Sequence, residues 1–414
     1  MSSMRKIRGF SDIMGAEARK FRLMEETAST VFSRYGYDEL RLPLLERTEL
    51  FARSIGSDTD VVQKEMFTFP DRKGRYVTLR PEATAGAVRA YIENKLYAGQ
   101  NLTKLFTVGP MFRYERPQKG RQRQFHQVNA EAFGSASPLL DAEMVLMLWT
   151  YLSELGLTNL TLQINSLGCR ECQPEYARRL QEYLRDTEAD DFCSDCSERR
   201  ERNPLRLLDC KQTQCQELIH EAPSMLDCLC ENCRPHFNTV LDNLQRMGID
   251  YEVNSRLVRG LDYYQRTTFE VMSGEIGAQS SVAGGGRYDD LVRQLGGPDH
   301  PAIGFACGME RLSLLLDDPA PAETDFYVAI LDGEGLPEGM RVCEGLRRNG
   351  LRGEMSYETA SLKSQIRHAD RIGARYCIFL GREELESGRL TVRDMGSGEQ
   401  YNREAEALPE FLGR

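Results

Sequence analysis

Hydrophobic and polar residues alternate along the chain with different periods, and each period predicts an element. Residues 15–35 carry apolar side chains at helical spacing, and Gly36 ends this run. Residues 36–46 then have the composition of a strand. Pro43 suits an edge or a bend of that strand, because a proline cannot donate to a central ladder. The pattern predicts a long helix followed by a strand.

Two further strands are predicted at 105–116 and 125–133, with a polar, arginine-rich loop between them. Because side chains alternate along a strand, Arg113 and Glu115 are expected to share one face of the first strand. The second strand puts four side chains on one face: Phe125, Gln127, Asn129 and Glu131. Such a row makes a poor core, so it predicts the floor of a binding site.

Two stretches bring candidate polar groups to the starts of helices. Residues 77–79 read as a strand that enters a helix, with Pro81 in the first turn and Glu82 at the N-terminus. Residues 302–316 read as a strand followed by a helix, with Arg311 near its first turn, where backbone amides favour an anion. Helix capping by Glu82 and a merely solvated Arg311 are the alternatives, and the pattern leaves both open.

The remaining pattern predicts a second domain. An apolar helix at 141–155 and a strand at 158–165 belong to the first part of the chain. After a stretch at 317–323 with the composition of a linker, strands and helices alternate at 326–331, 338–349, 352–355, 361–372 and 376–380. This alternation predicts a small α/β domain around a mostly parallel sheet.

Composition narrows the class of protein. A chain of 414 residues is too long for one ordinary core, so two or three domains are expected. The N-terminus lacks the apolar region of a signal peptide, and no apolar run approaches the roughly 20 residues that cross a bilayer, which predicts a cytoplasmic protein. The net charge of −10 argues against a protein that coats nucleic acid generally, but a local basic strip can still bind phosphates.

Cysteines mark a change of composition between residues 166 and 235. Nine of the chain's 12 cysteines lie there: Cys169, Cys172, Cys193, Cys196, Cys210, Cys215, Cys228, Cys230 and Cys233. Two C-x-x-C pairs separated by a loop are the ligand pattern of a tetrahedral zinc site. The spacing favours one set of ligands: Cys193, Cys196, Cys230 and Cys233. Reduced thiols that fill small apolar spaces are the alternative, so the pattern assigns no metal.

The most unusual stretch is residues 257–264, which read Leu-Val-Arg-Gly-Leu-Asp-Tyr-Tyr. A buried arginine is costly unless it meets an anion or a carboxylate. Tyr263 and Tyr264 supply flat apolar faces with polar tips, which suit the enclosure of a small planar ligand. A structural ion pair between Arg259 and Asp262 in a turn is the alternative, and the spacing does not decide between them.

Residues 257–264 resemble, residue for residue, the histidine-recognition signature of histidyl-tRNA synthetases of the bacterial type, a class II aminoacyl-tRNA synthetase family. Residues 283–289, which read Ala-Gly-Gly-Gly-Arg-Tyr-Asp, resemble the second signature of that family. The resemblance extends over nearly the whole chain. The helix and strand ending at 46 resemble the dimer-forming motif, the strand pair resembles motif 2, and 302–316 resembles motif 3.

The resemblance implies an α+β fold. Its class II antiparallel-sheet catalytic core is expected at 1–166 and 236–318, with a mostly helical, cysteine-rich insertion domain at 167–235. A C-terminal α/β anticodon-binding domain is expected at 324–414. The reaction implied is ATP-dependent ligation of L-histidine to tRNA(His) through a histidyl-adenylate, with release of AMP and pyrophosphate, by a homodimer.

The resemblance also implies roles for the residues that match the motifs. Arg113 and Arg259 would be catalytic at the α-phosphate, Arg311 would contact the outer phosphates of ATP, and Mg²⁺ is expected beside the β- and γ-phosphates. Further contacts to ATP would come from Glu115, Arg121 and Phe125, with Phe125 stacked on adenine. The histidine pocket would consist of Glu82, Ala83, Thr84, Gln127, Glu131, Tyr263, Tyr264 and Tyr288, together with Arg113 and Arg259. Structural zinc stays open.

Two other functions fit parts of the pattern. One is the catalytically silent relative that serves as a regulatory subunit of ATP phosphoribosyltransferase, and the other is a class II synthetase for another amino acid. The presence of all three arginines and of a C-terminal α/β domain argues against the first. Residues 257–264 argue against the second.

Overall fold

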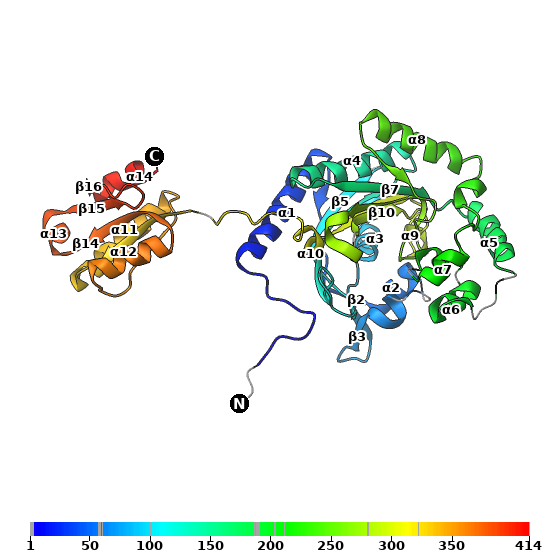
Figure 1. Cartoon of the computed structure of the whole chain (residues 1–414), viewed down its shortest axis with the longest axis horizontal. Helices are drawn as coiled ribbons and strands as arrows, with labels where there is room; N and C mark the ends of the chain where they lie inside the picture. The colour runs from blue at the N-terminus through cyan, green and yellow to red at the C-terminus, as the bar shows by residue number, and fades with distance from the viewer. Residues whose placement is uncertain are drawn as a thin grey trace. The chain divides into compact units, whose positions relative to one another are not determined.

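The computed structural model describes residues 4–56, 59, 61–99, 101–185, 187, 191–202, 204–210, 212–279, 281–321 and 323–413. The chain forms two compact units, Met1–Pro319 and Ala320–Arg414 (Figure 1). Each unit has its own sheet and its own hydrophobic cores. Within the described ranges, no helix is long and apolar enough to cross a membrane.

The described part of the first unit is built on an eight-stranded sheet of order β1-β5-β6-β11-β10-β9-β7-β8. The central pairings are antiparallel, and only the outer pairings, β1 with β5 and β7 with β8, are parallel. The strands are β1 (Asp38–Glu39), β5 (Thr103–Phe112), β6 (Gln124–Phe133), β7 (Leu160–Ser166), β8 (Glu252–Val253), β9 (Gln265–Ser273), β10 (Ser281–Arg287) and β11 (Ala302–Gly308). The predicted α+β class with an antiparallel catalytic sheet is confirmed.

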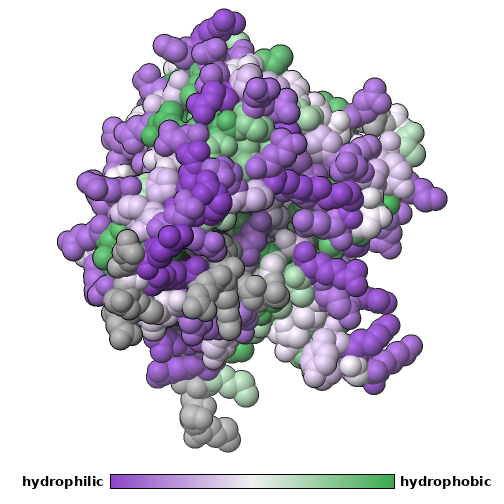
Figure 2. All heavy atoms as spheres, turned by 90° about the vertical axis from the view of Figure 1, so that its right-hand side faces the viewer, coloured by the Kyte–Doolittle hydropathy of each residue, from purple (hydrophilic) through white to green (hydrophobic). Residues whose placement is uncertain are grey.

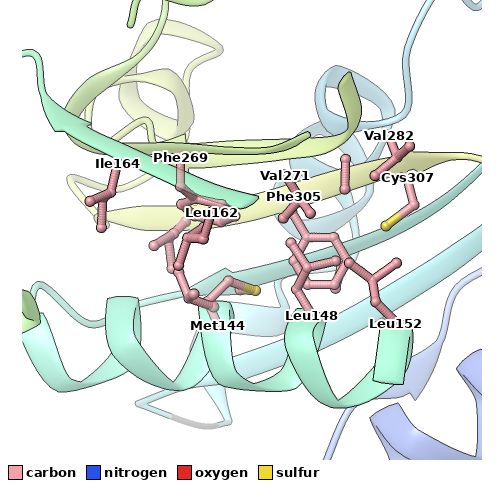
Figure 3. Packing of buried hydrophobic residues seen from close by; sticks show 14 of the residues in the cluster. Met144, Leu148, Leu152, Leu162, Ile164, Phe269, Val271, Val282, Phe305 and Cys307 are labelled. Carbon is pink, nitrogen blue, oxygen red and sulfur yellow. The ribbon is translucent and has the colours of Figure 1, made fainter. Parts of the chain in front are cut away.

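Helices cover one face of this sheet: α1 (Gly15–Arg34), α4 (Pro138–Glu154) and α8 (Cys233–Arg246). The Ser137 hydroxyl accepts from the amide of Leu139 and caps α4, and Pro138 occupies its first turn. Met144, Leu148 and Leu152 of α4 pack against sheet residues such as Phe269 and Phe305 (Figure 3). Burial of a leucine such as Leu148 contributes about 1.5–3 kcal/mol, so this face holds the main core. A smaller hydrophobic cluster, which includes Tyr91, Leu105 and Phe133, covers part of the opposite face.

A smaller, three-stranded sheet in the described part has the order β2-β4-β3. Its strands are β2 (Leu45–Arg47), β3 (Phe67–Pro70) and β4 (Tyr76–Leu79), accompanied by α2 (Thr48–Ile55) and α3 (Thr84–Glu93). The strand predicted at 36–46 is divided between β1 and β2, and Pro43 lies between them. The proline interrupts the strand, as its missing amide donor requires.

The first strand of the predicted pair ends early, at Phe112. The amide of Tyr114 donates to the carbonyl of Glu65 at 2.7 Å, so the chain leaves the sheet there. Arg113 and Glu115 therefore lie beyond the strand, and the prediction that they share one of its faces is wrong.

Two predicted helices also begin or end elsewhere. Helix α3 begins at Thr84, so Pro81 lies in the approach to the helix and not in its first turn. Helix α10 (Met309–Leu312) is a single turn and ends before the predicted 316. Arg311 still lies in the first turn after β11, as predicted.

The cysteine-rich region is mostly helical. It contains α5 (Cys172–Tyr183), α6 (Ser194–Arg202), α7 (Thr213–Leu218) and short 3-10 helices at Pro204–Asp209 and Met225–Cys228. Its buried side chains, such as Tyr176 and Leu207, belong to the same hydrophobic cluster as the catalytic sheet. The face that carries these helices is largely hydrophilic (Figure 2). The domain boundary predicted at 235/236 falls inside α8, and the insertion domain stays a prediction.

The described part of the second unit has a five-stranded sheet of order β13-β12-β14-β15-β16. Its strands are β12 (Thr324–Ile330), β13 (Gly353–Met355), β14 (Ala374–Leu380), β15 (Arg389–Asp394) and β16 (Gln400–Glu404). Its helices are α11 (Leu336–Arg348), α12 (Leu362–Arg371), α13 (Arg382–Ser387) and α14 (Leu408–Leu412). The parallel part matches the predicted alternation, but β15 and β16 pair antiparallel, so the expectation of a mostly parallel sheet is wrong.

Candidate functional site

The open face of the large sheet carries the predicted row of polar side chains on β6. Glu131 lies opposite Gly304 of β11, and Glu270 of β9 lies opposite Gly284 of β10. A Cβ atom on Gly304 would overlap Glu131 Oε2, and one on Gly284 would overlap the guanidinium of Arg259. The glycines of neighbouring strands therefore leave the space that these charged side chains occupy.

Arg113 and Arg259 are held on this face by different partners. Arg113 Nε donates to the carbonyl of Pro81 at 2.9 Å, and its guanidinium lies 5.3 Å from the centre of the Phe125 ring. Arg259 Nη1 donates to Glu270 Oε1 at 3.1 Å, and its guanidinium lies 5.7 Å from the Tyr264 ring. Both cations are thereby kept on the open face.

The structure brings Arg113, Arg259 and Arg311 together, and we call them the arginine cluster. Burial lowers the pKa of Arg311, and the positive charges of Arg121, Arg113 and Arg259 lower it further. Burial likewise lowers the pKa of Arg113, and Arg259 adds to this. Cations that repel one another in a desolvated place stabilise a polyanion that enters between them.

The loop between β5 and β6 reaches this cluster. Arg121 forms an ion pair with Glu115, and Gly120 lies against the aliphatic part of Arg311. Arg311 Nη1 donates to the carbonyl of Ser281 at 2.6 Å. The loop and α10 therefore meet at the same end of the site, whereas Lys119 of the same loop is exposed.

A buried group of polar and aromatic side chains adjoins the arginines. Thr84 Oγ1 donates to Glu131 Oε1 at 2.6 Å, and the Tyr288 hydroxyl donates to the other carboxylate oxygen. The ring of Tyr263 lies 4.7 Å from that of Tyr264 and 5.6 Å from that of Tyr288. Burial raises the pKa of Glu131 to about 8, since a carboxylate loses its hydration there. These side chains, which we call the pocket, combine aromatic rings with the buried carboxyl group of Glu131.

Glu82 caps the N-terminus of α3, which is the alternative role that the sequence pattern allowed. Its two carboxylate oxygens accept from the amides of Thr84 at 2.6 Å and Ala85 at 2.9 Å, which caps α3. Ala83 is the N-cap residue of that helix and is buried. Burial raises the pKa of Glu82, while these amide donors and Arg113 act in the opposite direction. Glu82 therefore adds a buried carboxyl group to the Thr84 end of the pocket.

Two buried polar atoms in this site have no hydrogen-bond partner within the described residues: Gln127 Oε1 and Arg259 Nε. An unsatisfied buried polar atom costs roughly 1–3 kcal/mol, so such atoms are rare unless a ligand or water completes them. An acceptor and a cationic donor that both lack a partner fit a ligand with a donor and an anionic group.

The alternative partner considered for Arg259 is wrong. Asp262 does not pair with it but accepts from Arg206 Nε at 3.3 Å, and Arg206 Nη2 donates to the carbonyl of Gly260 at 2.6 Å. Glu270 is the carboxylate partner of Arg259, and the sequence pattern did not predict this role. The alternation of Phe269 and Val271 toward the core could have identified Glu270 as facing the site.

A second group that the sequence analysis missed lies behind the pocket. Arg287, next to Tyr288, is entirely buried and donates to Asp141 Oδ1 at 2.7 Å and to Asp289 Oδ1 at 2.9 Å. Asp141 also lies 2.8 Å from His236 Nε2. This network joins β10 to α4 and α8, and thus holds the strand that carries the second signature.

An antiparallel sheet whose open face gathers separated arginines beside a buried pocket, followed by a separate α/β unit, is the arrangement of a class II aminoacyl-tRNA synthetase. A family model described as histidyl-tRNA synthetase matches residues 9–312, and one described as anticodon binding domain matches residues 325–414. The chain belongs to the histidyl-tRNA synthetase family.

Individual relatives are similar to this chain over nearly the whole length of both proteins. The chain is 57% identical over 412 residues to a histidine–tRNA ligase of Oleidesulfovibrio alaskensis, covering 99% of each chain. It is 55% identical over 399 residues to that of Maridesulfovibrio salexigens, covering 96% of this chain and 97% of the relative. The structure matches apo histidyl-tRNA synthetase of S. aureus with a TM-score of 0.83 and 34% identity, covering 100% of both chains.

Proposed function

We propose that the protein ligates L-histidine to tRNA(His) in two steps. Histidine and ATP first form histidyl-adenylate and pyrophosphate, and the histidyl group then passes to the 3′-terminal ribose of the tRNA with release of AMP. One observation carries the proposal: the arginine cluster converges beside a buried pocket with Glu131 at its floor.

The arginine cluster suits the first step. The carboxylate of histidine attacks the α-phosphorus of ATP and pyrophosphate leaves, so negative charge builds on phosphate oxygens. Fixed cations stabilise such charge without having to reorganise. Arg113 would bind the α-phosphate and the carboxylate, Arg259 the α-phosphate in the transition state, and Arg311 the outer phosphates. Phe125 would stack on adenine.

Mg²⁺ fits the acidic residues that face the arginine cluster. Mg²⁺ is usually held by one or two carboxylates together with substrate phosphates. Glu115 and Glu270, which pair with Arg121 and Arg259, are the carboxylates that would serve, and Arg121 would contact ATP beside them. The ion would supply neutralising charge at the β- and γ-phosphates.

The pocket suits histidine. Glu131, Gln127 and Tyr264 offer polar atoms for the imidazole N–H groups, and Tyr263 and Tyr288 enclose the ring. Glu82, Ala83 and Thr84 lie at the end of the pocket that would take the α-amino group, and Glu82 supplies a buried carboxyl group there. A pocket that hydrogen-bonds its ligand rejects analogues strongly, because they leave its polar groups unpaired.

The same proposal includes tRNA and a second protomer. The exposed Arg116 and Gln118 of the β5–β6 loop would meet the acceptor end, together with Arg121. The unit that matches an anticodon-binding domain would bind the anticodon. Homodimerisation is supported by the exposed apolar side chains of Leu44, Leu45 and Tyr76 near the segment that resembles the dimer-forming motif. Sedimentation equilibrium at twice the chain mass tests the dimer.

Histidine-dependent exchange of pyrophosphate into ATP tests the proposed function. We expect exchange with histidine and none with proline or threonine, because only histidine completes the polar groups of the pocket. Exchange with all three amino acids would contradict the assignment, and so would absence of exchange, which the regulatory relative would give.

Replacement of Glu131 by glutamine should weaken histidine binding in a pH-dependent way. Since the pKa of Glu131 is raised to about 8, the carboxyl group is mostly protonated below that pH and ionised above it. Only the ionised form accepts strongly, so the variant should lose about 10- to 100-fold in affinity at high pH and little near about pH 6.

Free histidine also changes its protonation with pH, and it does so equally in experiments with wild type and with the variant. The variant therefore controls for the titration of the ligand. Calorimetry of wild type and Glu131→Gln across the pH range isolates the contribution of Glu131 as the difference between the two curves. A loss that is equal at every pH would show that Glu131 does not titrate against the bound ligand.

A further inference from the structure

Eight cysteines of the inserted region form two separate groups in the described structure. The first cysteine group is Cys169, Cys172, Cys230 and Cys233, and the second is Cys193, Cys196, Cys210 and Cys215. Within each group all four sulfur atoms lie within 4.8 Å of one another. All are free thiols. Each group thus offers four sulfur ligands around one point.

This arrangement corrects the ligand set that the sequence favoured. The pairs Cys193/Cys196 and Cys230/Cys233 belong to different groups, so their combination is wrong. The turn before α5 brings Cys169 and Cys172 to the start of α8, where the second C-x-x-C pair lies. Spacing along the chain identifies the pairs, but only the fold determines which pairs meet.

The distances within the groups fit a tetrahedral metal ion. Sulfur atoms of Cys169 and Cys172 are 3.8 Å apart, as are those of Cys169 and Cys230, and those of Cys193 and Cys210. Four sulfurs at the Zn–S distance of about 2.3 Å stand about 3.8 Å from one another at the corners of a tetrahedron. A disulfide would need about 2.05 Å. A cluster of several irons would spread the sulfurs further apart, because its own atoms lie between them.

Backbone amides also donate to sulfurs of both groups. The amide of Cys230 donates to Cys172 Sγ at 3.2 Å, and the amide of Cys193 donates to Cys215 Sγ at 3.3 Å. Amide donors to sulfur are the outer contacts that orient ligands in metal sites.

We propose that each cysteine group binds one structural zinc ion. Four cysteine ligands leave no open position for chemistry, and tetrahedral sulfur coordination selects zinc among the common divalent ions. The sites would close the loops between the short helices of this region.

The two sites also explain how the inserted region contacts the histidine pocket. Arg170, between two ligands of the first group, forms an ion pair with Asp290, which follows the second signature. Arg206, shortly before Cys210 of the second group, bonds to Gly260 and Asp262 in the recognition segment. Zinc would therefore position Arg170 and Arg206 against the two signatures. This part of the inference rests on the proposed function.

Metal analysis of the purified full chain tests the sites independently of activity. We expect about two zinc ions per chain, one for each group, with about one remaining in Cys172→Ser and about one in Cys210→Ser. Cys228→Ser is the matched control, because Cys228 is a thiol of the same region outside both groups. It should keep the full zinc content. Release of zinc by a mercurial, followed with a chromogenic chelator, gives the same count without mutation.

Each outcome decides the proposal. Active protein without zinc, or with iron in its place, would overturn it. A variant that keeps the full zinc content of wild type would overturn the site that its substitution removes. For the positioning role, Arg206→Ala should keep both zinc ions while the KM for histidine rises with kcat nearly unchanged. An unchanged KM would overturn that role and leave the zinc sites standing.

Discussion

Replacement of Arg259 by alanine is expected to slow histidine activation by at least about 100-fold, with little change in the fold. Arg259 is held on the open face by Glu270 and extends toward the other arginines. Loss of one fixed charge at a developing anion costs about 3 kcal/mol or more, which corresponds to this change in rate. The measurement is the single-turnover rate of adenylate formation at saturating histidine and ATP.

Two further variants separate this role from a general loss of charge. Arg259→Lys keeps a cation but not the planar fork, so its rate should fall between those of wild type and Arg259→Ala. Arg34→Ala removes an exposed arginine whose ion pair with Glu154 lies on the surface, and it should leave the rate unchanged. A normal rate in Arg259→Ala would show that this arginine does not act on the α-phosphate.

The parts of this site that the sequence predicted depend on local periodicity. Gln127, Asn129 and Glu131 lie on one face of β6 because alternation is a property of the strand itself. The helix at Gly15–Arg34 follows likewise from apolar residues at helical spacing. For such elements, burial of one face and backbone hydrogen bonding favour the same conformation, and the pattern is sufficient.

The parts that the sequence could not predict depend on which distant segments meet. Arg259 pairs with Glu270 and not with its neighbour Asp262, because the strand β9 passes beneath it. The end of β5 is set by the amide of Tyr114, which bonds to Glu65, a residue of another segment. In both cases the bonding partner is a residue that the fold brings close, and not one that is near along the chain. Spacing along the chain therefore cannot predict which residue becomes the partner.

Replacement of Arg287 by methionine should destabilise the catalytic unit by about 3–5 kcal/mol, the cost of leaving one partner of a buried ion pair uncompensated. Arg287 has no exposed side-chain surface, and besides its carboxylate partners it donates to the carbonyls of Ser135 and Ser137 at 3.0 and 3.1 Å. Urea unfolding of the full chain measures the change. The transition of the second unit, with its own core, should stay in place and serves as the internal reference.

The pH dependence of that loss distinguishes charge from packing. Burial opposes the charge of Asp141, but Arg287 and His236 outweigh it and hold the pKa of Asp141 below its usual value of 3.8. Its contribution to stability is therefore present above that value and is lost as the pH falls through the lowered folded-state pKa. The gap between wild type and Arg287→Met should shrink as the pH falls, because protonation of Asp141 in the variant removes the unpaired charge. The double variant Asp141→Leu, Arg287→Met should be more stable than Arg287→Met alone at neutral pH, since it removes both charges of the Asp141–Arg287 pair. A gap that stays constant with pH, and a double variant that loses the sum of both single changes, would assign the loss to packing instead.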